Sequence, residues 1–146
     1  MLTSIRDVRL LDLRRIESAS AGNMTVVESP GDVPFAVARV YYVYDIPGGA
    51  SRGSHGHKRL ERVLVAVTGS FRVVVDDGEA RQTFTLSRAH QGLYLPQLLW
   101  IELTDFSSGA VCLVLASRPF EEDDYIRGYD EFLDYRAVQR SARGIR

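Results

Sequence analysis

Short runs of alternating apolar and polar positions dominate the chain from residue 36 onward. Residues 36–44, 62–67 and 71–75 are rich in β-branched and aromatic side chains, which favour strands. Residues 82–86, 93–96, 100–103 and 110–116 repeat this pattern, and shorter extended runs occupy residues 6–14 and 24–27. Asp77-Gly78, between two of the runs, predicts a tight hairpin turn. About nine or ten short strands separated by turns predict an all-β sandwich or barrel.

Helical periodicity is confined to the C-terminal part of the chain. Apolar positions recur there at helical spacing, and Asp123 or Asp124 can cap the first turn. The apolar stripe consists of Tyr125, Ile126, Tyr129, Phe132 and Leu133. We therefore expect one short C-terminal helix, followed by a basic end, residues 136–146, that is frayed and solvated.

Length and composition limit the possible classes of protein. The chain has 146 residues, 45% hydrophobic and 25% charged, so we expect a single domain over residues 1–146. A net charge of −1 gives no general attraction to nucleic acid or to an anionic membrane. No apolar run approaches the ~20 residues that span a bilayer, and the N-terminus lacks the apolar segment of a signal peptide. A cytoplasmic location is the resulting expectation, and Cys112, inside an apolar run, is predicted to be a buried structural thiol.

Two of the three histidines are candidates for chemistry. Residues two apart on a strand point to the same side, so the imidazoles of His55 and His57 are expected to share one site, with Glu61 beside them by parity. Together with Gly49 these residues complete the spacing Gly-x5-His-x-His-x3-Glu, which is identified as the first motif of the cupin jelly roll. Many cupins bind a metal through this motif, and two histidines with a carboxylate can hold a divalent ion such as Fe(II).

The second cupin motif departs from the metal-binding pattern. Its ligand is a histidine five residues after the proline, but here Pro96 is followed at that spacing by Ile101. Arg52 and Lys58 flank the two histidines, and this concentration of positive charge favours an anionic ligand such as phosphate over a divalent cation. A metal-dependent cupin enzyme, for example a dioxygenase using the two histidines and Glu61, remains an alternative. A purely structural role for the histidines also remains open.

Residues 52–58 resemble the Arg-Gly-x-His-Ala-His-Lys signature of the dTDP-4-keto-6-deoxy-D-glucose 3,4-ketoisomerases. The resemblance continues in order through residues 69–71, 76–78, 92–96 with Trp100, 105–107, 113–117 and 124–132, and it covers roughly residues 6–135. Several motifs in one order are more specific than any single motif. The resemblance implies a cupin double-stranded β-helix, or jelly roll, with a short C-terminal helix.

The same resemblance implies an isomerase of deoxyaminosugar biosynthesis. Its substrate would be a dTDP-linked 4-keto-6-deoxy sugar, whose ketone moves from C4 to C3 through an enediol or enediolate without a metal or other cofactor. The implied assembly is a homodimer with exchanged N-terminal strands, and neither nucleic acid nor membrane is expected as a partner. A non-catalytic cupin that binds a nucleotide sugar is a further alternative.

The reaction suggests a role for each candidate side chain. A neutral histidine can remove the proton α to a ketone near pH 7, and by resemblance His57 is the expected base and His55 its partner, although the sequence leaves open which of them takes the proton. The candidate cationic ligands of the diphosphate are Arg39, Arg52, Lys58 and Arg127. The candidate aromatic contacts for thymine or sugar are Tyr41, Tyr44, Trp100 and Tyr125.

The chain departs from the family pattern at three positions. Relatives commonly carry alanine where Gly56 stands, often glutamine where Arg62 stands, and a polar residue, frequently histidine or arginine, where Ile101 stands. Ile101 is expected at the wall of the pocket. The missing polar group there bears on which face of C4 receives the proton, so the stereochemistry of the product stays open.

Overall fold

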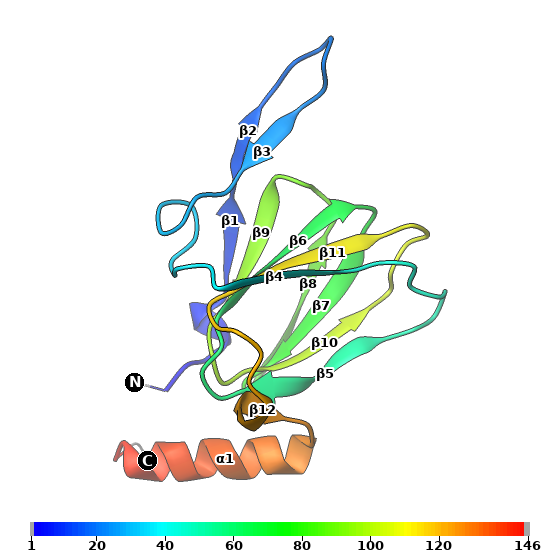
Figure 1. Cartoon of the computed structure of the whole chain (residues 1–146). Coiled ribbons are helices and arrows are strands. Elements are labelled where there is room, and N and C mark those ends of the chain that lie inside the picture. The colour runs from blue at the N-terminus through cyan, green and yellow to red at the C-terminus, as the bar shows by residue number, and fades with distance from the viewer. Residues whose placement is uncertain (1, 145–146) are drawn as a thin grey trace.

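The computed structural model describes residues 2–144 as two five-stranded antiparallel sheets with a helix at one end (Figure 1). The first sheet has the order β1 (Arg9–Asp12), β9 (Gln91–Leu95), β6 (Arg62–Thr68), β11 (Val111–Ala116) and β4 (Arg39–Val43). The second has the order β12 (Tyr125–Ile126), β5 (Arg52–His57), β10 (Trp100–Thr104), β7 (Phe71–Asp76) and β8 (Arg81–Leu86). The predicted all-β jelly roll with a short C-terminal helix is confirmed.

The apolar alternation of the strands places the main core between the two sheets. Val73 and Val75 of β7 point into it, and so do Leu64 of β6 and Val114 of β11 on the facing sheet. Cys112 is fully buried in the same cluster, and burial raises the pKa of its thiol to about 12. The prediction of a structural thiol is confirmed, because a protonated and inaccessible sulfur is a poor nucleophile.

The turn between β7 and β8 follows its sequence. Gly78 has φ +89°, a left-handed conformation that favours glycine, and the Asp77 carboxylate accepts hydrogen bonds from the N–H groups of Glu79 and Ala80. The same aspartate accepts a hydrogen bond from the N–H of Ile5, in the 3-10 turn Ile5–Asp7. The hairpin therefore also fixes the N-terminal segment.

A two-stranded arm, β2 (Arg14–Ile16) and β3 (Met24–Val26), projects beyond the two sheets (Figure 1). Its apolar side chains Ile16 and Met24 are more than half exposed. A short extended segment was expected at residues 24–27, but β2 lies almost wholly beyond the run predicted at residues 6–14. The pairing of the two strands and their position away from the barrel were not predicted.

The C-terminal helix begins later and ends later than predicted. Residues Glu122–Asp124 form a 3-10 turn, Tyr125–Ile126 form β12, and α1 spans Tyr129–Ala142 with Gly128 as its N-cap. Asp124 does not cap the helix because its carboxylate is bound elsewhere.

The expectation of a frayed end from residue 136 was wrong for the last turns of the helix. The buried guanidinium of Arg136 donates to the carbonyls of Leu98 and Thr3 and so ties the helix to the barrel. Residues 145–146 lie outside the described residues. Within residues 2–144, no helix is long and apolar enough to cross a membrane.

Candidate active site

A cavity of about 280 Å³ lies between the two sheets beside the histidine pair. Three guanidinium-bearing side chains line it, together with one imidazole and two phenols, and none of the described residues in its wall is Asp or Glu. The polar lining residues are Arg39, Tyr41, Arg52, His55, Arg62 and Tyr125. The wall therefore carries an excess of positive charge, which suits an anionic ligand.

Strand register explains why these side chains meet. Ala116 of β11 pairs with Arg39 of β4 on one side and with Arg62 of β6 on the other. Side chains directly opposite each other on neighbouring strands share a face, so both arginines project into the cavity across a small alanine. On the facing sheet, Ile101 of β10 pairs with His55 of β5, and both line the cavity. The expectation that Ile101 lies at the pocket wall is confirmed.

The strand that carries the histidines is irregular just before them. Gly53 has φ +90°, and a Cβ at this position would lie 2.9 Å from the carbonyl oxygen of Ile101. The register shifts between Ile101 and Glu102, opposite this point. Such bulges redirect side chains. The rings of His55 and His57 meet edge to face with centroids 4.9 Å apart, so the two imidazoles lie together as predicted, and His55 is the one of the two that lines the cavity.

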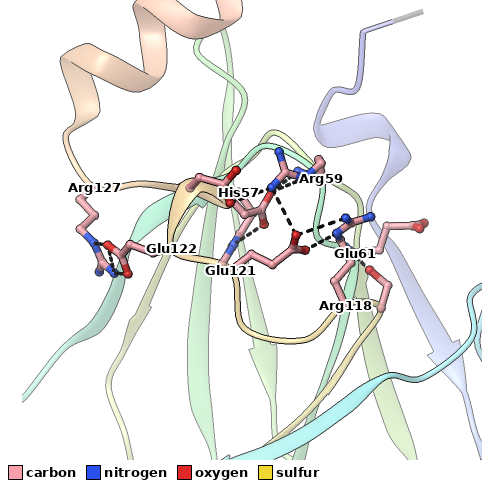
Figure 2. A network of polar contacts seen from close by, with 10 residues as sticks. His57, Arg59, Glu61, Arg118, Glu121, Glu122 and Arg127 are labelled. Atoms are coloured by element: carbon pink, nitrogen blue, oxygen red, sulfur yellow. Dashed lines mark hydrogen bonds and ion pairs between the residues drawn. The ribbon is translucent and has the colours of Figure 1, made fainter.

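His57 forms a buried pair with Asp124, and Figure 2 shows His57 among the neighbouring polar contacts. Nδ1 of the imidazole lies 3.0 Å from Oδ2 of the carboxylate, and the two side chains are 2% and 4% exposed. Oδ1 of the same carboxylate accepts the backbone N–H of Arg59 at 2.7 Å. Because an ionised carboxylate only accepts, Nδ1 carries the proton and Nε2 holds the free electron pair.

The Nε2 atom of His57 is buried without a hydrogen-bond partner among the described residues. Only two other buried side-chain nitrogens or oxygens of residues 2–144 share this property, Nε of Arg39 and Nε of Arg62. Both of these arginines line the cavity, and His57 lies directly behind His55 and Tyr125 in its wall. Buried polar atoms are normally satisfied, so the two unsatisfied arginine nitrogens of the cavity wall and the imidazole nitrogen behind it indicate a site for a polar ligand.

Both histidines are neutral in this environment. Nδ1 of His55 lies 2.5 Å from the carbonyl oxygen of Gly53, to which it donates. Burial lowers the pKa of His55 to about 4, with a further contribution from the positive charge of Arg62. The pKa of His57 is lowered more strongly, first by burial and then by Arg62 and His55. Two neutral imidazoles near pH 7 are competent to accept protons.

Four of the predicted ligand residues lie in the cavity wall, namely Arg39, Arg52, Tyr41 and Tyr125. Arg127 lies next to it, with its guanidinium carbon 4.4 Å from the centroid of the Tyr125 ring and a hydrogen-bonded ion pair to Glu122. Its side chain is 57% exposed. Arg127 is thus at the rim of the cavity, available to a ligand that extends out of it.

Three other predicted ligand residues lie elsewhere. The Lys58 ammonium sits 5.3 Å from the ring centroid of Tyr135 on α1, because the chain turns after β5 ends at His57. Tyr44 follows β4 on its exposed face and packs against Tyr42. Trp100 faces away from the cavity, toward Tyr129 and Phe132 of the helix. We do not assign Lys58, Tyr44 or Trp100 to the ligand.

Glu61 is not beside the histidines, so the parity expectation was wrong. It lies beyond the end of β5, where strand alternation no longer holds. Its carboxylate accepts a hydrogen bond from the Tyr94 hydroxyl at 2.6 Å. Burial and this bond raise the pKa of Tyr94. No group of three or more His, Cys, Asp or Glu side chains suited to hold a metal ion occurs within residues 2–144.

Sequence reasoning did not place Asp124 or Arg62 at this site. Asp124 was interpreted as a helix cap, and the 67 positions that separate it from His57 give no local signal of pairing. Arg62 was noted only as a departure from the family pattern. The start of a buried strand is an unusual place for an arginine, and this was the signal that could have identified it.

Known proteins share this architecture. The family model described as FdtA: WxcM-like, C-terminal matches residues 6–137. A protein of Aneurinibacillus thermoaerophilus named TDP-4-oxo-6-deoxy-alpha-D-glucose-3,4-oxoisomerase is 47% identical over 116 residues, which make up 80% of this chain and 84% of that protein. A solved 3,4-ketoisomerase from Helicobacter canadensis has a TM-score of 0.87 and 37% identity, covering 90% of this chain and 98% of that one.

A second solved structure is a complex with a nucleotide sugar. It is a variant of the 3,4-ketoisomerase QdtA from Thermoanaerobacterium thermosaccharolyticum in complex with TDP-4-keto-6-deoxyglucose. It has a TM-score of 0.88 and 34% identity, and the match covers 91% of this chain and 96% of that one.

Proposed function

Because the chain belongs to the FdtA family (WxcM-like, C-terminal), we propose that it is a TDP-4-keto-6-deoxyglucose 3,4-ketoisomerase and works as a single catalytic domain. The relatives named above support this substrate and this reaction. The observation that carries the proposal in this chain is the buried His57–Asp124 pair, whose ring packs against His55 and Tyr125 in the wall of a cation-rich cavity and whose Nε2 has no partner among the described residues. The site is thus equipped for a base and an anionic substrate.

The proposed reaction moves two protons, and the substrate and the product have the same composition. Nε2 of His57 takes the proton from C3, the C–H electrons form a C3=C4 double bond, and the ketone electrons move to O4 as an oxyanion. The O3 proton passes to O4, and protonation of C4 then leaves the ketone at C3. His55, on the cavity wall, is the proposed shuttle for the hydroxyl proton. Because no hydride or electron leaves the sugar, the chemistry needs no redox cofactor.

The remaining residues of the cavity hold the substrate in this proposal. Arg39, Arg52 and, at the rim, Arg127 are placed to bind the diphosphate, since guanidinium groups match phosphate oxygens. Tyr41 and Tyr125 offer aromatic faces to the sugar or thymine. His57 lies one layer behind the cavity surface, and catalytic contacts of this kind often tighten only when substrate binds.

The active form in this proposal is a homodimer with exchanged N-terminal strands. Strand β4 ends its sheet, and its outward side chains Val40 and Tyr42 are more than half exposed. The projecting arm likewise exposes Ile16 and Met24. Sheet edges and apolar arms of this kind are normally covered. Sedimentation should give the mass of two chains, and an Ile16→Arg, Met24→Arg double variant should shift it toward one; a wild-type monomer would refute this part.

The proposed location is the cytoplasm, in keeping with Cys112, a buried thiol that forms no disulfide. Such thiols persist in a reducing compartment.

Paired histidine variants test the catalytic assignment. Turnover of TDP-4-keto-6-deoxyglucose to the 3-keto sugar is followed by NMR for the wild type, His57→Asn, His55→Asn and, as a control, His90→Asn. We expect His57→Asn to lose nearly all turnover while still binding TDP, His55→Asn to lose less, and His90→Asn to behave like the wild type. Wild-type turnover in His57→Asn would show that the base is assigned wrongly.

A further inference from the structure

Arg62 carries a buried positive charge that nothing in the described structure neutralises. The residue is 6% exposed at the start of β6, and within residues 2–144 its side chain makes no hydrogen bond or ion pair. Its Nε is buried without a partner, and removing a charged group from water without pairing it is unfavourable. Groups of this kind are concentrated at functional sites, where a ligand can supply the opposite charge.

The negative charges of a nucleotide sugar can be matched by two arginines of the cavity wall other than Arg62. Each phosphate of the diphosphate carries one negative charge, and Arg39 and Arg52 in the cavity wall match these two charges. Arg52 is exposed and Arg39 partly so, whereas Arg62 is buried. The diphosphate, attached to a nucleoside that extends outward, therefore belongs near the exposed arginines.

Arg62 belongs to the end of the cavity where the sugar reacts. Its charge is the largest single ionic influence on both His55 and His57, and in each case it lowers the pKa of the imidazole. The register places it across Ala116 from Arg39, on the face that looks toward His55 and Ile101. A sugar whose C3 lies at the histidines thus has its C3 and C4 oxygens next to this guanidinium.

We propose that Arg62 is a catalytic residue whose guanidinium donates hydrogen bonds to O3 and O4 of the sugar and stabilises the enediolate oxyanion. This inference rests on the proposed function. O3 and O4 lie side by side in the plane of the enediolate, and the planar fork of an arginine can span such a pair. In the resting enzyme Arg62 has no negatively charged partner. When the C3 proton leaves, negative charge develops on O4, where it can pair with Arg62. An interaction that strengthens at that moment lowers the barrier, because it is stronger in the transition state than in the bound substrate.

The same charge has a second consequence for the base. A cation beside two imidazoles disfavours the imidazolium form, so both histidines stay neutral in the resting enzyme, and the same charge weakens them as bases until a negative charge forms on the substrate. When the proton has moved, the enediolate lies between the new imidazolium and Arg62. The anion then compensates the repulsion between the two cations.

The test compares Arg62→Met and Arg62→Lys with the wild type. Arg62→Met removes the charge and every hydrogen-bond donor at similar length, and kcat should fall about 10²- to 10³-fold, the usual effect of losing one oxyanion donor. KM and the Kd for TDP should change little, because the interaction forms mainly in the transition state. Arg62→Lys keeps the charge but loses the fork, so its kcat should lie between those of the wild type and Arg62→Met.

Three measurements keep the outcomes distinct. Circular dichroism and TDP binding establish that each variant is folded, and Arg72→Gln, which removes an exposed arginine paired with Asp105, controls for a lost surface charge and should retain full activity. If the wild type itself does not isomerise the sugar, the proposed function fails. If the wild type is active and a folded Arg62→Met keeps its kcat, or loses only TDP affinity, then Arg62 is not an oxyanion donor and the inference is overturned.

Discussion

The His57–Asp124 pair makes a sharp prediction for the substitution Asp124→Asn. The carboxylate accepts two hydrogen bonds, from Nδ1 of His57 at 3.0 Å and from the N–H of Arg59 at 2.7 Å. An amide of the same shape has one oxygen. If that oxygen keeps the Arg59 bond, the NH₂ group faces His57 and forces the proton from Nδ1 to Nε2, which removes the basic electron pair from the cavity side.

The expected loss can be estimated from the geometry. When His57 takes the substrate proton, it becomes an imidazolium beside a carboxylate. With an effective dielectric constant of ~20, two unit charges ~4 Å apart attract by about 4 kcal/mol. Each 1.36 kcal/mol corresponds to a factor of ten in rate, so losing this attraction lowers kcat by up to about 10³. Because the amide retains a dipole, part of the attraction remains, and we expect kcat to fall by about 10²- to 10³-fold.

The assay combines kinetics with the tautomer itself. Turnover is measured for Asp124→Asn and for Asp123→Asn, a neighbouring change at a carboxylate that is 79% exposed. ¹⁵N NMR of labelled protein reports which nitrogen of His57 carries the proton. We expect Nδ1–H in the wild type, Nε2–H in Asp124→Asn, and near-normal activity in Asp123→Asn. A folded Asp124→Asn with wild-type kcat, or a wild-type His57 already protonated at Nε2, would refute the reasoning.

Three further predictions concern pH and packing. The pKa of His55 is lowered to about 4 and that of His57 is lowered as well, so both imidazoles stay deprotonated as pH falls. We therefore expect kcat/KM to be level from pH 7 to about pH 5. A decrease of kcat/KM with an apparent pKa near 6.5 would contradict this. The unfolded chain binds these protons at higher pH than the folded protein does. The contribution to the free energy of unfolding is therefore complete above about pH 6.5 and is lost progressively toward pH 4. A urea midpoint that rises as pH falls over this interval would show the sign to be wrong. Gly56→Ala would place a Cβ 3.1 Å from Cδ1 of Phe132 and 3.2 Å from the Leu99 carbonyl oxygen, and should destabilise the fold by about 1 kcal/mol relative to Gly31→Ala, which meets no atom within 4 Å; equal melting temperatures for the two variants would reject the crowding.

Local signals explain most of what could be predicted from the sequence. Alternation predicted the central strands, Asp77-Gly78 predicted the hairpin, and the two-residue spacing of His55 and His57 predicted that their rings lie together. Each of these depends on residues that are neighbours along the chain.

The misses depend on contacts between distant residues. Asp124 looks like a helix cap until the chain is folded, and only then does its carboxylate reach His57. Arg136 reads as part of a basic tail, but tertiary packing buries it against the carbonyls of Leu98 and Thr3. Glu61 had the correct parity, yet β5 ends at His57, so alternation no longer predicts its direction. Tertiary context decided all three.

The central claim, proton transfer at C3 and C4 by the protein's own side chains, is tested most directly in D₂O. Chelator-treated protein is incubated with TDP-4-keto-6-deoxyglucose, and the sugar is followed by ¹H NMR. We predict loss of the C3 proton signal, formation of the 3-keto sugar and deuterium at C4, at a rate that added divalent metal does not change. An unchanged C3 proton with no product, or turnover that disappears on chelation and returns with metal, would contradict the account.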